Sequence, residues 1–160
     1  MTIAEYVSHL NTLYITGHAR EHSYRGDLQT LVSTILPDIL VTNEPARVSC
    51  GAPDYMLTRK AVPVGYIEAK DIGVDLNSKS LKEQFDRYKA GLNNLVITDY
   101  LQFKFYKGGE FITEISIATL EDGQIKPLSE NFERFTHLLS DFALVVSQSI
   151  KSPTRLAKMM

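Results

Sequence analysis

The chain has 160 residues, which is enough for one domain that buries a core without disulfides. Its single cysteine, Cys50, excludes an internal disulfide and favours a reducing, cytoplasmic setting, and no apolar run reaches the roughly 20 residues of a membrane helix. The net charge of −2 comes from 17 basic and 19 acidic residues, and this balance argues against strong autonomous binding to nucleic-acid phosphates.

Two helices are predicted first. Apolar residues recur at helical spacing from Ile3 to Leu13, and a second amphipathic segment follows Gly17 and runs to about Leu36, where Pro37 stops it. Residues 38–50 predict an irregular extended stretch. The start of the chain is therefore expected to be mainly helical.

Short β-type runs dominate the middle of the chain. Residues 54–58 and 62–70 predict a hairpin, and a polar loop at 75–80 leads into an amphipathic helix at 81–92. Further strands are predicted at 95–98, 101–106 and 111–120, before a final helix at 129–149. The sum is an α/β fold in which helices flank a central mixed sheet of four to five strands.

The hairpin carries a set of residues suited to phosphodiester hydrolysis. A turn centred near Ala61 would place Asp54 and Glu68 opposite each other, with Cβ atoms about 4.5–5.5 Å apart. Two carboxylates at that separation favour a cation, and Mg²⁺ prefers such oxygen ligands. Lys70 shares their face because strand side chains alternate, whereas the Ala69 side chain points into the core and its carbonyl offers a further metal ligand.

The following helix adds an amide and a phenol. Gln84 and Tyr88 are four residues apart and share a helix face. The amide can orient an attacking water or a metal ligand, and the phenol can contact a phosphate. An ordinary polar helix face with Tyr88 partly in the core remains the alternative.

Three of these motifs together resemble a known superfamily. Pro53-Asp54, residues 68–70 (EAK) and residues 84–88 (QFDRY) resemble the PD-(D/E)XK nucleases, in the branch with a trailing Q-x-x-x-Y motif. More narrowly, residues 64–110 are similar to the N-terminal endonuclease domain of fused type IIG and type ISP restriction–modification enzymes. The resemblance implies a restriction-endonuclease-like core that cleaves DNA.

The resemblance also implies roles for individual residues. Asp54 and Glu68 would be metal ligands for Mg²⁺, with Mn²⁺ as a substitute, and Lys70 would be the catalytic lysine. Gln84 and Tyr88 would be the auxiliary pair. Members of the superfamily often carry an acidic residue on a helix before the hairpin, where Glu21 stands in this chain, and Arg25 nearby would meet a phosphate.

The same resemblance implies an organisation beyond the nuclease. Residues 1–150 would form the nuclease domain, and residues 151–160 would begin a helical linker. Methyltransferase and target-recognition segments would be covalently linked to it and would supply DNA affinity. Transient dimerisation would allow a double-strand break.

Two other functions fit parts of the sequence. His18 to His22 reads H-x-x-E-H, an inverted zinc-peptidase motif, although Gly17 puts it at a helix start. The second alternative is a catalytically inactive binding module with the nuclease fold. Metal-dependent DNA cleavage would distinguish an active nuclease from this module. Loop solvation is the expected role of Asp71 and Asp75.

A modest basic edge lies near the predicted site. It comprises Lys79, Lys82, Arg87 and Lys89 on the helix that carries Gln84. These side chains would follow a DNA backbone, but a solvated helix face would look the same.

Overall fold

The computed structural model describes residues 1–19, 21–45 and 51–151, and the side chains of 21, 22 and 145–151 lie outside that description. Its elements in chain order are α1 (Ile3–Tyr14), α2 (Glu21–Ile35), β1 (Leu40–Asn43), β2 (Tyr55–Arg59), β3 (Val62–Ala69), α3 (Lys79–Gly91), β4 (Asn94–Thr98), β5 (Gln102–Lys107), β6 (Glu110–Ser116), β7 (Ala118–Glu121), β8 (Gln124–Pro127), the short 3₁₀ helix η1 (Ser129–Asn131) and α4 (Phe132–Lys151). No helix in the described part of the chain is long and apolar enough to cross a membrane.

The main sheet has six strands in the order β1-β2-β3-β4-β5-β6. Only β3 and β4 pair in parallel, so the sheet is mixed as predicted. The expected number of four to five strands was wrong because a four-residue edge strand, β1, lies in the stretch predicted to be irregular. The predicted last strand also divides after Ser116 into β6, which belongs to the main sheet, and β7, which does not. A second small sheet pairs β7 with β8.

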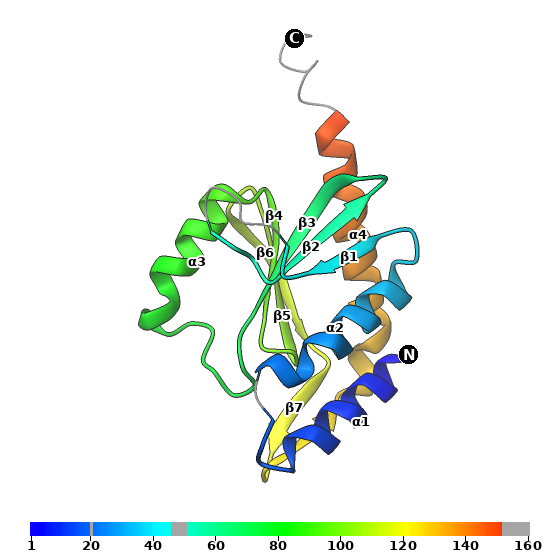
Figure 1. Cartoon of the computed structure of the whole chain (residues 1–160), viewed down its shortest axis with the longest axis vertical. Coiled ribbons are helices and arrows are strands. Elements are labelled where there is room, and N and C mark those ends of the chain that lie inside the picture. The colour runs from blue at the N-terminus through cyan, green and yellow to red at the C-terminus, as the bar shows by residue number, and fades with distance from the viewer. Residues whose placement is uncertain (20, 46–50, 152–160) are drawn as a thin grey trace.

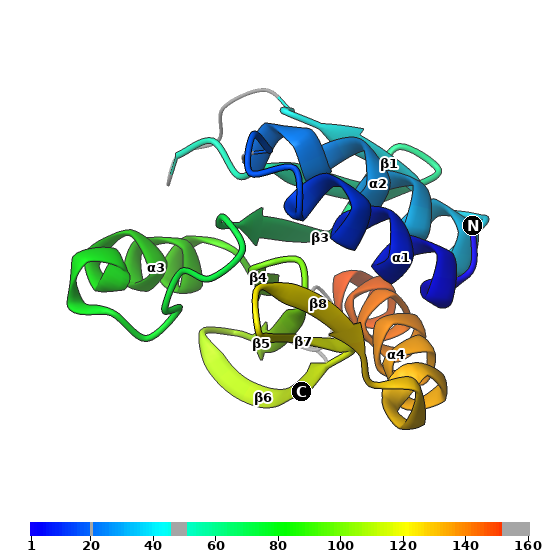
Figure 2. The same ribbon diagram turned by 90° about the horizontal axis from the view of Figure 1, so that it is seen from below.

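Helices cover both faces of the main sheet. In Figures 1 and 2, α3 stands alone on one side, whereas α1, α2 and α4 lie on the other. The larger core fills the side of α1, α2 and α4, and a smaller cluster around Phe85, Tyr88 and Leu95 packs beneath α3. Strand alternation therefore divides the residues of each strand between two different environments.

The predicted helices form close to their expected bounds. Thr2 and Glu5 form a capping box at the start of α1, satisfying two backbone N–H groups. α2 ends at Ile35, just before Pro37, and its Leu28 and Leu31 are fully buried. These local signals explain why both helices were predictable.

The β2–β3 hairpin turns at two residues with left-handed backbone. Lys60 and Ala61 have φ values of 51° and 68°, and Arg59 pairs with Val62 on either side of them. A two-residue turn with both φ values positive matches the right-handed twist of its strands. The turn therefore lies half a residue before the centre at Ala61 that was predicted.

A β-bulge follows in β3 and shifts the register by one residue. Val64 has no partner in β2, and pairing resumes at Leu57 with Gly65. Continued beyond Tyr55, this register sets Asp54 opposite Glu68. Without the bulge, the residue before Glu68 would take that place, and the carboxylates would point to opposite faces.

Gly65 admits the side chain of Phe142 from α4. A Cβ at Gly65 would lie 2.6 Å from the Phe142 ring, which is closer than any normal contact. Phe142 in turn meets Phe105 at a ring-centroid distance of 5.8 Å. This close approach seats α4 against β3.

We therefore expect Gly65→Ala to lower the free energy of unfolding by about 1–3 kcal/mol, because the added methyl overpacks the helix contact. Urea unfolding measures the change. Gly26→Ala is the matched control, because Gly26 lies in α2 with open space around it and should gain about 0.5–1 kcal/mol from helix propensity. Equal stability of Gly65→Ala and the unaltered chain would contradict the proposed packing.

Candidate active site

Two hydrogen bonds between backbone and side chain join Asp54 to Glu68 and to the next residue, Ala69. The Asp54 N–H donates to Glu68 Oε1 at 3.3 Å, and the Ala69 N–H donates to Asp54 Oδ2 at 2.8 Å. Asp54 immediately precedes β2, and Glu68 lies one residue from the end of β3. The two carboxylates therefore meet at the end of the hairpin opposite its turn, as the sequence predicted.

Glu68 is a buried acid beside another acid. Glu68 is 3% exposed. Burial is the main cause that raises its pKa to about 7, and the nearby charge of Asp54 is the second. The Lys70 ammonium opposes this shift. The pair thus holds more negative charge than its surroundings readily tolerate at neutral pH.

Lys70 lies on the same side as Glu68. Its Nζ is 3.3 Å from Glu68 Oε2, and its backbone N–H donates to the Thr98 carbonyl at 2.8 Å. The second bond extends the β3–β4 pairing by one residue. The ammonium is therefore held beside the carboxylate pair from a fixed backbone position.

Arg25 reaches the site from α2. Its guanidinium forms an ion pair with Asp54 Oδ1 and lies 3.1 Å from Asn43 Oδ1 and 3.5 Å from Glu44 Oε2. The Tyr55 hydroxyl donates to the Arg25 carbonyl at 2.9 Å. The guanidinium is thus buried against Asp54, and its expected contact with a phosphate stays a prediction.

Tyr88 packs against the segment that leads into Asp54. A Cβ built at Gly51 would lie 3.1 Å from the Tyr88 hydroxyl oxygen, and the backbone of Ala52 hydrogen-bonds to that hydroxyl. Burial raises the Tyr88 pKa, and the charges of Glu68 and Asp54 raise it further. The phenol therefore lies within electrostatic reach of both acids.

Gln84 lies one turn before Tyr88 on α3 and is half-buried. Among the described residues, the structure records no hydrogen bond between Gln84 and either carboxylate. Its role as an auxiliary residue stays a prediction.

The other predicted candidates lie at the start of α2 or outside the described residues. α2 begins at Glu21, so His18 precedes the helix, and the side chains of Glu21 and His22 are outside the described residues. The two histidines of the zinc-peptidase motif are therefore not one turn apart on a single helix. Cys50 also lies outside the described residues.

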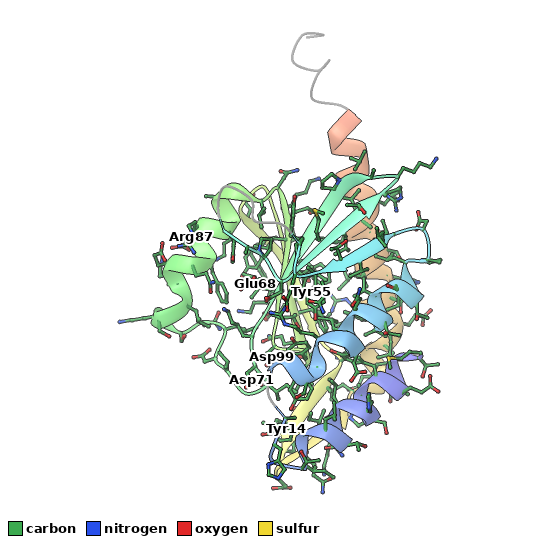
Figure 3. The ribbon with its side chains drawn as sticks, in the orientation of Figure 1. Tyr14, Tyr55, Glu68, Asp71, Arg87 and Asp99 are labelled. Carbon is green, nitrogen blue, oxygen red and sulfur yellow. The ribbon has the colours of Figure 1, made fainter. Side chains whose placement is uncertain are left out.

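The polar loop and the basic edge form local contacts. Asp71 and Asp75 accept hydrogen bonds from the backbone of their own loop. On α3, Lys82 pairs with Asp86 at 2.6 Å and Arg87 with Glu83 at 2.8 Å. Figure 3 shows Glu68 at the centre of the molecule and Arg87 on α3, away from it.

The donor set of the site suits a hard divalent cation. Mg²⁺ is commonly held by one or two carboxylates and keeps several waters. Asp54 and Glu68 supply two carboxylates, and the described residues contain no group of three or more potential metal-ligating side chains. Burial and, after it, repulsion from Asp54 raise the Glu68 pKa, and a bound cation would relieve the repulsion, so these residues fit a magnesium ion.

Sequence reasoning missed Asn43 and Glu44. Asn43 is the last residue of β1, which was not predicted, and Glu44 comes directly after it. Glu44 has a left-handed backbone with φ of 56°. Its N–H donates to the Asp54 carbonyl at 2.7 Å. A reading of residues 40–43 as an edge strand would have brought both residues to Asp54.

Comparison with known proteins shows the fold. No protein-family model matches the chain, and no curated protein matches it. A cryo-EM structure of a DrdV–DNA complex matches with a TM-score of 0.67 and 19% sequence identity. The fold resembles one part of DrdV. The match covers 88% of this chain and 13% of the DrdV chain, so this chain spans a small share of that protein's length.

The raised Glu68 pKa gives the stability of the metal-free protein a pH dependence. The folded state holds the Glu68 proton up to about pH 7, whereas the usual value for the group is 4.5, so the free energy of unfolding should fall as pH rises between these values. The full loss is about 3 kcal/mol. Urea unfolding in EDTA from pH 5 to pH 8 should show it, and Glu68→Gln should remove it.

Glu130→Gln is the matched control, because Glu130 is exposed and far along the chain from the hairpin. Parallel curves for the unaltered chain and Glu68→Gln would contradict the burial of a charged pair.

Proposed function

We propose that this chain is a metal-dependent DNA endonuclease domain of a restriction–modification enzyme, which hydrolyses phosphodiester bonds with an activated water. The observation that carries the proposal is the meeting of Asp54, Glu68 and Lys70 at one end of the β2–β3 hairpin, with Glu68 buried and its pKa raised to about 7. Perturbed acids beside a lysine are typical of functional sites.

The fold supports DNA as the partner. DrdV, one part of which this chain resembles, was solved as a complex with DNA. The intact set of two carboxylates and one lysine favours an active nuclease over an inactive binding module. The motifs favour the PD-(D/E)XK superfamily in its Q-x-x-x-Y branch, and the likeness to DrdV supports the coarser assignment to a nuclease-like fold.

Asp54 and Glu68 would hold Mg²⁺ or Mn²⁺, with the Ala69 carbonyl as a further oxygen ligand. A bound ion would polarise the scissile phosphate and make a water more nucleophilic at neutral pH. The attacking oxygen comes from water, so no covalent intermediate with the protein forms.

The chain's own residues prepare the site around that water. The Arg25 guanidinium and the Ala69 N–H hold the two oxygens of Asp54 in place. The Lys70 ammonium stabilises the negative charge that develops on the phosphate oxygens. Tyr88 would contact the phosphate, Gln84 would orient the water, and Glu21 would add an acidic side chain.

Target choice belongs to other segments in this proposal. A net charge of −2 gives little general affinity for DNA, so linked methyltransferase and target-recognition segments would supply it. Residues 1–150 would be the nuclease domain, whereas residues 152–160, which were expected to belong to a helical linker, lie outside the described part of the chain. Pairing of two copies would produce a double-strand break, and the setting would be cytoplasmic.

The decisive experiment is cleavage of supercoiled plasmid with Mg²⁺, Mn²⁺ or EDTA. We expect feeble metal-dependent nicking by this chain, because linked segments would supply most of the DNA affinity. Asp54→Ala, Glu68→Ala and Lys70→Ala should each lower the rate at least about 100-fold, because the two carboxylates would hold the cation and the ammonium would stabilise the charge on the phosphate. Lys126→Ala, at an exposed position on β8, is the matched control for Lys70.

Circular dichroism should show that each variant keeps the fold. A folded variant that cuts like the unaltered chain would overturn the site assignment. If the unaltered chain binds DNA without cutting it in either metal, the inactive binding module becomes the better account.

Gln84 should matter less than Glu68. We expect Gln84→Ala to slow cleavage about tenfold, because an amide that orients water supports the reaction without binding the cation. The same plasmid assay measures it, with Glu83→Ala as the control at the neighbouring exposed position on α3. A loss equal to that of Glu68→Ala would reverse the assigned roles.

A further inference from the structure

Lys104 is a buried lysine whose charge is weakly compensated. It lies on β5, is 7% exposed, and its Nζ donates to the neutral Asn77 Oδ1 at 2.6 Å. Its carboxylate partner, Glu114, is 4.0 Å away and has a side chain that is 48% exposed. Burying an ammonium is costly unless an anion comes close to it.

Lys104 lines a pocket of about 240 Å³ between α3 and strands β4 and β5. Lys82 and Lys89 of α3 line it too, together with one acid, Asp86. Lys82 pairs with Asp86, and Lys89 Nζ lies 4.6 Å from the centre of the Tyr106 ring. The excess positive charge in the pocket therefore rests on Lys104 and Lys89, and it favours an anionic ligand.

The pocket lies on the same sheet face as the candidate active site. Glu68 pairs with Ile97 across β3 and β4, and Ile97 pairs with Lys104 across β4 and β5. Directly paired residues point to the same face, so all three face α3. Two strand spacings place the Cα atoms of Glu68 and Lys104 about 10 Å apart.

This spacing suits one strand of nucleic acid. Every nucleotide of a DNA strand carries one phosphate, so one strand bound at the carboxylates would bring a nearby phosphate within reach of Lys104. Ammonium groups bind phosphate as point charges, and the apolar floor of Phe85, Ile97 and Tyr106 can pack against sugar or base.

We propose that the Lys104 pocket binds a backbone phosphate of the DNA strand, close along the strand to the phosphate at Asp54 and Glu68. The position of the reacting phosphate rests on the proposed function. Binding of the strand by Lys104 does not require cleavage, so DNA binding and DNA cleavage can be tested separately.

Binding of a fluorescein-labelled 12-nucleotide single strand to the 160-residue chain in EDTA tests the proposal. Fluorescence anisotropy from 50 to 200 mM NaCl gives the affinity and its salt dependence. We expect Lys104→Met to weaken binding about tenfold at 50 mM and to lower the magnitude of the salt slope by about 0.7, the share of one phosphate on a single strand. Lys104→Arg should retain most of the affinity, and Lys126→Met should be unchanged.

Lys89→Met keeps the test valid if Lys104→Met fails to fold, because Lys89 is only half-buried and should weaken binding in the same direction. Affinity and slope unchanged in both folded variants would overturn the proposal, as would an unaltered chain that binds no DNA at 50 mM NaCl.

Calorimetric titration with inorganic phosphate separates a small ligand from a strand. Binding of phosphate that depends on Lys104, with DNA affinity unaffected by Lys104→Met, would overturn the strand proposal. Lys104-dependent DNA binding without metal-dependent cleavage would support the pocket while contradicting the nuclease.

Discussion

Two like charges at one partly buried place need opposite charges around them, and this constraint organises the centre of the molecule. Neighbouring carboxylates repel, and burial strengthens the repulsion because it lowers the effective dielectric constant around them. The Arg25 guanidinium, on α2, forms an ion pair with Asp54. The Lys70 ammonium, directly after β3, forms an ion pair with Glu68. The position of α2 is in turn fixed to the sheet edge, where Gln29 Nε2 donates to a β1 carbonyl at 2.8 Å. The helix, the edge strand and the hairpin thus depend on one another through a few charges.

Much of the fold was predictable because its signals are local. The helical spacing of apolar residues from Ile3 to Leu13 and the stop at Pro37 each act over a few neighbouring positions. β1 and β8 escaped prediction because they are four-residue strands, and their pairing partners are what make them strands. The sixth strand of the main sheet could therefore be found only from tertiary structure.

The core of the site was predictable from strand alternation, but the prediction depended on two offsets that cancel. The turn lies half a residue earlier than expected, and the unpaired Val64 restores the alignment of Asp54 with Glu68. Lys104 was overlooked although its signal was present. A lysine between Phe103 and Phe105 faces the opposite side of the sheet from both aromatics, and only the position of α3 shows that this side is also covered.

The bulge also makes the length of the hairpin part of its chemistry. Substitutions along β2 and β3 leave the alignment of the two strands intact, whereas adding or deleting one residue within the paired segments would exchange the two faces of everything beyond it. Asp54 would then be directed away from Glu68 although both residues were still present. Related sequences with the same three polar residues but a hairpin one residue longer or shorter would need a compensating irregularity to share this chemistry. The length of the hairpin, in addition to the identity of its polar residues, thus becomes a criterion for deciding which relatives have a competent site.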